Sequence, residues 1–178
     1  MEFIAIMLQN TLVLVGLLFQ YIGSSIFLEK KAQKYTSIFL FVIFSSSYFY
    51  STFINESMPD RNTISSVFYA LISFLIAFNF LNNKNKTISS SSYFLAAVLI
   101  ISGIFFILRI IIGYKLPSDF FNSSLLQIFT FLIVIAEGSL LTFGLIIMLN
   151  QRLNAVMAEA NNKLEITNKE LQKLNSQK

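Results

Sequence analysis

The chain has 178 residues, of which 55% are hydrophobic and only 12% are charged. A soluble domain of this length needs more charge to cover its surface, so the composition favours an integral membrane protein. The sequence contains neither cysteine nor histidine. It therefore lacks the residues for a disulfide framework, a lipid-modified cysteine or a phospho-accepting histidine, and it lacks the most common metal ligand and general base. We predict no catalytic residue, no metal site and no cofactor.

Five stretches are long and apolar enough to cross the hydrocarbon layer, which takes about 20 residues of α-helix. They predict membrane spans at about residues 3–22, 36–54, 64–81, 93–113 and 124–149. The connectors at residues 55–62, 82–92 and 116–119 carry charge, proline or turn-forming polar residues, so we predict loops there. The predicted fold class is an all-α membrane protein: a bundle of about five transmembrane helices at residues 1–149 and a C-terminal cytoplasmic coiled-coil helix at residues 150–178.

The basic residues of the short connectors predict the orientation in the membrane. The first and third connectors contain five lysines, Lys30, Lys31, Lys34, Lys84 and Lys86. The second contains only Arg61, and Lys115 is the only basic residue between the fourth and fifth predicted spans. Because cytoplasmic loops are enriched in Lys and Arg, we expect the amino terminus outside and the carboxyl terminus in the cytoplasm. The first apolar run follows Glu2 without any basic residue, which favours an uncleaved helix over a signal peptide.

Two charged residues lie within the predicted spans, Arg109 in the fourth and Glu137 in the fifth. Their depths differ by about 14 Å along the helices, so we do not expect them to form an ion pair. Arg109 lies level with Gln127, and Gln9 and Asn10 are at a similar depth. This outer polar layer either lines a ligand pocket or lets Arg109 reach the lipid headgroups.

Glu137 lies level with Asn79 of the third predicted span, near the middle of the membrane. A charge at this depth is costly, so an ionisable residue here has either a functional role or a hydrogen-bonding partner. The functional interpretation is a ligand pocket, or a group that couples helix movement to a signal. The structural interpretation is a protonated carboxyl group that is hydrogen-bonded to a neighbouring helix.

After Leu149 the sequence becomes polar, lacks glycine and proline, and is rich in helix formers. Its apolar residues recur with the spacing of a heptad repeat. The core positions are Leu153, Met157, Ala160, Leu164, Thr167, Leu171 and Leu174. This pattern predicts a parallel dimeric coiled coil that is continuous with the fifth span, with Thr167 as one weak core layer. A single solvated helix is the alternative.

Two passages resemble parts of bacterial membrane sensors. The passage from Phe143 to Leu153 (FGLIIMLNQRL) is similar to their last membrane helix, and that from Asn168 to Lys178 (NKELQKLNSQK) is similar to their signalling helix. In sensor histidine kinases such a helix usually precedes the dimerisation and phosphotransfer domain, and in membrane-bound diguanylate cyclases it precedes the cyclase domain. The resemblance implies an input module in the bacterial cytoplasmic membrane, either the front part of a longer protein with an output domain or a stand-alone remnant of one.

We therefore predict the membrane sensory region of a two-component sensor histidine kinase, which relays a stimulus through the last span and the coiled coil. The outer connectors have only about ten residues each. We expect sensing within the membrane, by a small lipophilic ligand, the state of the lipid bilayer or a partner helix. The basic residues are scattered at the ends of apolar segments, which excludes nucleic acid as a partner. Three alternatives remain: the input region of a diguanylate cyclase, a small proton-coupled transporter that uses Glu137, and a structural anchor that dimerises a partner.

Overall fold

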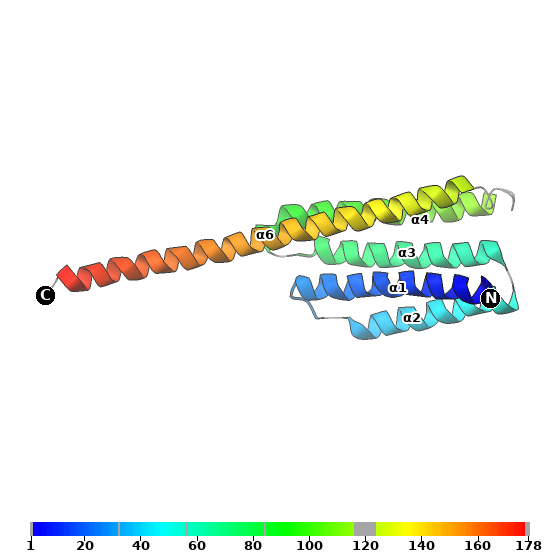
Figure 1. Cartoon of the computed structure of the whole chain (residues 1–178), viewed down its shortest axis with the longest axis horizontal. Helices are drawn as coiled ribbons and strands as arrows, with labels where there is room; N and C mark the ends of the chain where they lie inside the picture. The colour runs from blue at the N-terminus through cyan, green and yellow to red at the C-terminus, as the bar shows by residue number, and fades with distance from the viewer. Residues whose placement is uncertain (1, 32, 56, 84, 116–123, 177–178) are drawn as a thin grey trace.

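The computed structural model describes residues 2–31, 33–55, 57–83, 85–115 and 124–176. Within these ranges all regular secondary structure is helical and no strand is present (Figure 1). The long helices in chain order are α1 (Glu2–Phe27), α2 (Lys34–Phe49), α3 (Met58–Leu81), α4 (Ser89–Lys115) and α6 (Ser124–Ser176). All five helices are long and apolar enough to cross a membrane, if α2 is taken together with the turn that follows it. The predictions of an all-α chain and of five membrane-length helices are therefore confirmed.

Two polar segments for which the sequence predicts loops begin helices instead. The hydroxyl oxygen of Ser57 caps α3 by accepting a hydrogen bond from the Asp60 N–H at 3.3 Å. Pro59 stands in the first turn, where its missing N–H costs no hydrogen bond. Residues 89–92 likewise form the first turn of α4. The loop prediction was therefore wrong for these four residues and for residues 58–62.

The helices form a bundle in which α3 lies between α1 and α4 (Figure 1). α2 ends in a π-helical turn, η1 (Tyr50–Ile54), and packs against α1 and α3, whereas α6 packs mainly against α4. A short 3-10 turn, η2 (Lys86–Ile88), precedes α4. The centre of the bundle is apolar, and its most deeply buried side chains include Leu14, Ile72 and Leu99.

Glycine lets neighbouring helices approach closely at two places. A Cβ atom at Gly144 of α6 would lie 2.8 Å from Cγ of the buried Leu95 on α4. A Cβ atom at Gly103 of α4 would lie 2.8 Å from Cζ of Phe74 on α3. Small residues at such contacts are typical of membrane bundles, where close packing rather than hydrophobic exclusion holds helices together.

α6 continues from the bundle into the tail as one helix of 53 residues. From Leu153 onwards each side chain that the structure describes is exposed. Two ion pairs at helical spacing, Glu159–Lys163 and Glu165–Lys169, lie on this exposed part. The tail leaves the bundle at the end where α1 and α3 finish, and the amino terminus lies at the opposite end (Figure 1).

Candidate functional site

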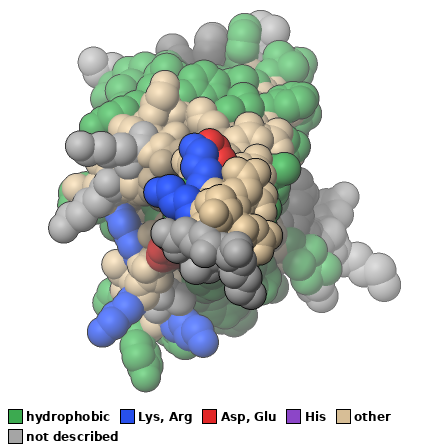
Figure 2. Space-filling view, turned by 90° about the vertical axis from the view of Figure 1, so that its left-hand side faces the viewer, with side chains coloured by type: hydrophobic (Ala, Val, Ile, Leu, Met, Phe, Trp, Pro, Cys, Tyr) green, Lys and Arg blue, Asp and Glu red, His purple; other side chains and the backbone are tan. Residues whose placement is uncertain are grey.

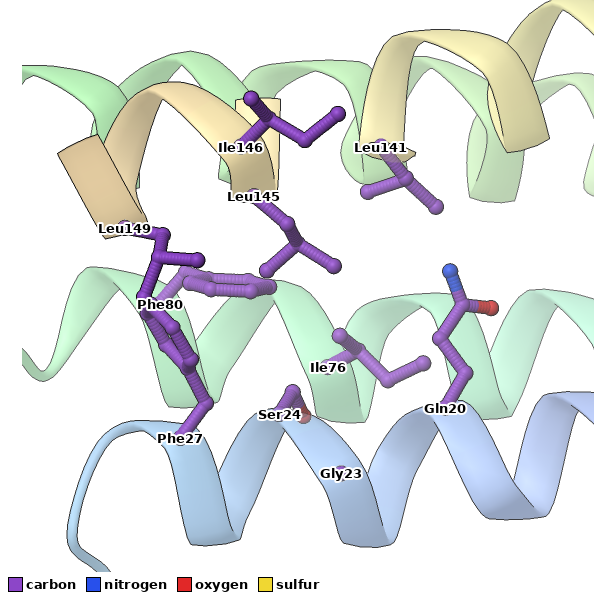
Figure 3. A pocket seen from close by; sticks show the side chains of 10 residues that line it. All are labelled: Gln20, Gly23, Ser24, Phe27, Ile76, Phe80, Leu141, Leu145, Ile146 and Leu149. Atoms are coloured by element: carbon purple, nitrogen blue, oxygen red, sulfur yellow. The ribbon is translucent and has the colours of Figure 1, made fainter. Parts of the chain in front are cut away.

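A groove runs between α1 and α6, with α3 beneath it. Its larger part is a cavity of about 340 Å³. Figure 3 shows the side chains of α6, including Leu145 and Leu149, pointing across the cavity toward α1, where Gly23 and Phe27 line it. Phe80 of α3 contributes a ring from below. The lining is almost entirely apolar.

A smaller cavity of about 120 Å³ lies beside the first and is more polar. Gln20 of α1 and Leu141 of α6 line both cavities, so the two are parts of one feature, which we call the α1/α6 groove. The smaller cavity is lined by Ser73 of α3 and by Glu137 of α6. The groove therefore has a polar part deep in the bundle and an apolar part toward the tail.

Glu137 connects α6 to α4 in the polar part of the groove. Its Oε2 accepts a hydrogen bond from the Ser102 hydroxyl group, and the residue is only 8% exposed. Its Oε1 is buried and has no hydrogen-bonding partner among the described residues. The Glu137 carboxyl group, with one oxygen bonded across helices and the other without a partner among the described residues, suits either of two roles. It is a structural contact, or it binds a molecule in the groove.

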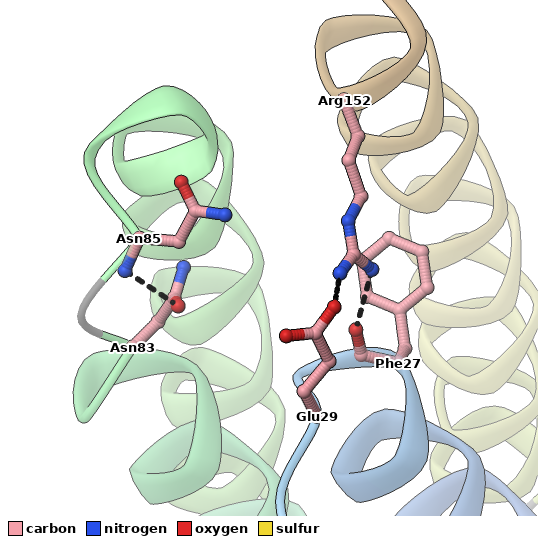
Figure 4. Close-up of polar contacts among 5 residues, drawn as sticks. All are labelled: Phe27, Glu29, Asn83, Asn85 and Arg152. Atoms are coloured by element: carbon pink, nitrogen blue, oxygen red, sulfur yellow. Dashed lines mark hydrogen bonds and ion pairs between the residues drawn. The ribbon is translucent and has the colours of Figure 1, made fainter. Parts of the chain in front are cut away.

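At the tail end of the groove, Arg152 of α6 holds the last turn of α1 (Figure 4). Its Nη1 donates a hydrogen bond to the Phe27 carbonyl oxygen at 3.1 Å, and its Nη2 forms an ion pair with Glu29 Oε1. The guanidinium carbon also lies 5.9 Å from the centre of the Phe27 ring. We call Arg152, Glu29 and Phe27 the Arg152 latch. Next to it, the Ser91 hydroxyl group donates to Gln151 Oε1 at 3.0 Å and ties α6 to α4.

The backbone of Glu29 is in the left-handed region, with φ of 57°. The Lys30 N–H donates to the Ser25 carbonyl oxygen at 2.9 Å, and the Glu29 N–H donates to the Ile26 carbonyl oxygen at 3.0 Å. These bonds define a Schellman motif that ends α1, and its left-handed position is usually occupied by glycine. A glutamate tolerates this conformation at a cost of about 1 kcal/mol. Glu29 therefore makes its contact with Arg152 from a backbone conformation that glutamate disfavours.

Asn79 lies at the same end of the bundle as the latch, and not beside Glu137. Its side-chain Nδ2 donates to Ser25 Oγ at 3.0 Å, and its backbone carbonyl oxygen accepts a hydrogen bond from Lys30 Nζ at 2.6 Å. Burial lowers the pKa of the Lys30 amino group. Asn79 and Glu137, expected at the same level, have different partners, since Glu137 bonds to Ser102. α3 begins at Met58, six residues before the predicted span.

The predicted outer layer is only partly covered by the structure. Arg109 Nη2 donates to Asn62 Oδ1 at 3.5 Å, while its Nε is buried without a partner among the described residues. Arg109 thus bonds to α3, and Glu137 bonds elsewhere, to Ser102. Asn10 is partly buried on α1. The side chains of Gln9 and Gln127 lie outside the described part of the structure.

The predicted coiled-coil positions form an exposed apolar stripe along the tail. Leu153, Met157, Leu164 and Leu171 are 52–63% exposed. Ala160 and Thr167 are exposed as well, and the side chain of Leu174 is not among those described. Extended backwards into the bundle, the same seven-residue spacing passes through exposed positions only: Asn150, Ile146, Phe143, Ser139 and Ala136. The face that α6 buries carries Glu137, Leu141, Gly144 and Met148. The exposed stripe therefore runs from Ala136 to Leu171, away from the face that α6 buries.

The Arg152 latch was not predicted from the sequence. A signal was present: Glu29 is the acidic residue of a basic connector, and Arg152 is the first charge after the last span, at the same membrane boundary. Arg61 was also missed, since it counts as a connector residue but is only 8% exposed, and its buried Nη1 has no partner among the described residues.

No group of three acidic, histidine or cysteine side chains that could hold a metal ion occurs in the part of the chain that the structure describes. The site is thus a groove between membrane-length helices that ends at a charged latch on the helix leading to the tail. No protein-family model, no curated protein and no solved structure matches the chain.

Proposed function

We propose that this chain is the membrane-embedded sensory and signal-transmission module of a bacterial sensor histidine kinase. The observation that carries the proposal is the continuity of α6, which runs from the core of the bundle into the exposed tail as a single helix of 53 residues. A rigid helix passes a rotation, a shift along its axis or a tilt from one end to the other. A change in the packing of α6 within the bundle therefore moves its tail and any domain or chain that the tail contacts.

In this proposal the chain lies in the bacterial cytoplasmic membrane with its amino terminus outside and its tail in the cytoplasm. The distribution of lysines over the connectors supports this orientation. The described bundle supports it too, because the tail and the α1–α2 connector, which contains Lys30 and Lys31, lie at the same end (Figure 1).

The active unit in this proposal is a homodimer whose tails form a parallel coiled coil. The exposed stripe from Ala136 to Leu171 supports this arrangement, because one helix face carries the heptad pattern both in the bundle and in the tail. Ala136 and Ser139 are small, which lets membrane helices approach. Asn150 occupies a core position at the boundary, and a single core asparagine is known to set register and favour two strands.

Signalling requires two packing arrangements of α6 that differ little in free energy. Two features of the bundle suit such a helix. The α1/α6 groove leaves one side of α6 loosely packed, and the Arg152 latch is partly solvated, with 32% of the Arg152 side chain and 75% of the Glu29 side chain exposed. A stimulus that alters the groove or the latch changes the position of α6 without unfolding the bundle.

The direct test is the dependence of output on helical phase. The full chain is fused through its tail to the dimerisation, phosphotransfer and ATP-binding domains of a sensor histidine kinase. Inserting two residues after Arg152 rotates the tail by about 200°, whereas inserting seven residues restores the phase to within about 20°. We expect autophosphorylation to change with the two-residue insertion and to return with the seven-residue insertion. Output that is the same for both insertions would contradict transmission through α6.

A diguanylate cyclase input region has the same architecture, and the coding sequence after residue 178 distinguishes the two outputs. A histidine-containing helical motif followed by an ATP-binding domain supports the kinase, and a cyclase domain supports the alternative. The transporter alternative depends on Glu137. Its test is proton flux in vesicles that contain the purified chain: flux that is lost in Glu137→Gln would favour transport over signalling.

A further inference from the structure

The larger cavity of the α1/α6 groove has the size and surface of a site for a hydrocarbon chain. Its volume of about 340 Å³ lies within the range of ligand pockets. Gln20 and Ser24 are its only polar lining residues among those described. The cavity is partly open to the surroundings of the bundle, so an acyl chain can enter it without passing through the bundle.

One residue belongs to both the cavity and the Arg152 latch. The Phe27 ring lines the cavity, lies under the Arg152 guanidinium group, and sits beside Leu149 where the cavity closes toward the tail (Figure 3). The Phe27 carbonyl oxygen accepts the hydrogen bond from Arg152. A chain that enters the cavity therefore meets the same ring on which the latch rests.

Two basic groups lie at the tail end of the groove. Figure 2 looks along the tail onto this end of the molecule and shows Lys and Arg side chains, with acidic ones among them, in front of the apolar wall of the bundle. Arg152 stands over the end of the cavity, and Lys30 bonds to the carbonyl oxygen of Asn79, next to the lining residue Phe80. An apolar cavity with basic groups at the membrane boundary matches a molecule with a hydrocarbon chain and an anionic head.

We propose that the α1/α6 groove binds one acyl chain of an anionic phospholipid, and that the lipid phosphate competes with Glu29 for Arg152. The open side of the cavity leaves the second acyl chain in the bilayer. The regulatory half of this inference rests on the proposed function, because it makes the lipid the molecule that releases α6 from α1. The lipid-binding half does not depend on it.

The competition has a definite sign. In the latch, Nη1 of Arg152 donates to the Phe27 carbonyl oxygen and Nη2 pairs with Glu29. A lipid phosphate that takes Nη2 displaces Glu29, so binding of one weakens binding of the other. Removing the charge of Glu29 must therefore increase lipid affinity. Removing a basic group at the mouth must decrease it, by about fivefold for one lysine or arginine near the surface.

The test uses the purified full chain and native mass spectrometry. Dioleoylphosphatidylglycerol is the anionic probe, and dioleoylphosphatidylcholine, which has the same chains and a neutral head, is the comparison. We expect preferential retention of phosphatidylglycerol by the wild-type chain. Gly23→Phe fills the cavity, and its matched control is Gly16→Phe, since neither glycine has any atom within 4 Å of a Cβ position and only Gly23 lines the cavity.

We expect Gly23→Phe to reduce phosphatidylglycerol retention to the level of phosphatidylcholine, and Gly16→Phe to leave it unchanged. Glu29→Gln should increase retention, an effect that misfolding cannot imitate, and Lys30→Gln should decrease it. Equal retention of the two lipids, or equal retention by the two glycine variants, would overturn the proposal. If the lipid binds as expected but does not change autophosphorylation of the kinase fusion, the lipid site is supported and the signalling function is contradicted. If the fusion obeys helical phase while the lipid is not retained, only this inference fails.

Discussion

Phe27 meets Arg152 twice: its carbonyl oxygen accepts a hydrogen bond from Nη1 at 3.1 Å, and its ring lies 5.9 Å from the guanidinium carbon. The two residues belong to the first and last long helices of the chain. Since α1 and α6 otherwise leave a groove between them, this contact decides how the end of α1 and the start of the tail move relative to each other.

Replacing Glu29 with glycine separates backbone preference from the ion pair. Glycine suits the left-handed backbone at this position, so Glu29→Gly should stabilise the end of α1 by up to about 1 kcal/mol. The same change removes the partner of Arg152, and an exposed ion pair contributes about 0–1 kcal/mol. We therefore expect unchanged or slightly increased thermal stability together with larger motion between α1 and α6. Cysteines that replace Lys31 and Ala155 carry spin labels, and the distance distribution between the labels measures that motion. Labelling is specific because the natural chain has no cysteine.

The matched change for this experiment is Arg152→Lys, which keeps the charge and loses the planar group that reaches two acceptors. It should broaden the distance distribution less than Glu29→Gly does. A distribution that is as narrow in Glu29→Gly as in the wild type would mean that the latch does not restrain α6.

Gly144→Ala should weaken the contact between α6 and α4. The added Cβ atom overlaps the buried Leu95 side chain, and overpacking of this kind costs about 1–3 kcal/mol. Gly16→Ala serves as the control, because its Cβ meets no atom within 4 Å and alanine favours helix by about 1 kcal/mol over glycine. Unfolding in denaturing detergent measures both, and we expect opposite signs. Equal shifts would show that α6 does not approach α4 at Gly144.

The Ser102–Glu137 hydrogen bond should contribute measurably to bundle stability. Ser102→Ala leaves both carboxyl oxygens of Glu137 without a donor among the described residues, at a cost of about 1–3 kcal/mol for an unsatisfied buried group. Ser139→Ala is the control: this exposed serine bonds only to the Ile135 carbonyl oxygen of its own helix in the described contacts. We expect a lower unfolding midpoint for the first variant and no change for the second. Since alanine favours helix over serine, a loss of stability of the same size in both variants would show that the Ser102–Glu137 hydrogen bond is not its cause.

Disulfide cross-linking along α6 tests the exposed stripe as the contact between two copies. Single cysteines at Phe143 and Leu164 should form intermolecular disulfides in membranes, because both positions face the predicted partner helix. Val134 and Asn162 are also exposed but lie on the other side of the heptad pattern, so cysteines there should remain reduced. Cross-linking that is equally strong at all four positions would indicate random collision and count against the dimer.

The hydrophobic pattern determines most of the fold, since apolar runs of membrane length leave few alternatives to helices. Helix ends were harder to predict. Pro59 and Ser57 read as a loop in isolation, but a proline in the first turn behind a serine cap starts a helix as readily as it stops one. That uncertainty of a few residues also affects the level expected for Asn79, which bonds to Ser25 and Lys30 in the structure.

The candidate site shows a different limit of sequence reasoning. Glu137 stands out in any reading because it is an isolated charge, yet its partner Ser102 is one of many serines and has no distinguishing pattern. The groove was not predictable for the same reason. It depends on which faces of α1 and α6 meet α3, and the weak amphipathicity of membrane helices does not specify those faces.

The length of α6 also fixes how far its tail reaches. The residues from Leu153 to Ser176 extend about 36 Å beyond the latch at the rise of an α-helix. This is several times the distance of about 8 Å over which salt screens the charge of a lipid surface. A domain joined to the end of α6 would therefore lie beyond the reach of headgroup charge and would respond to the membrane only through the helix.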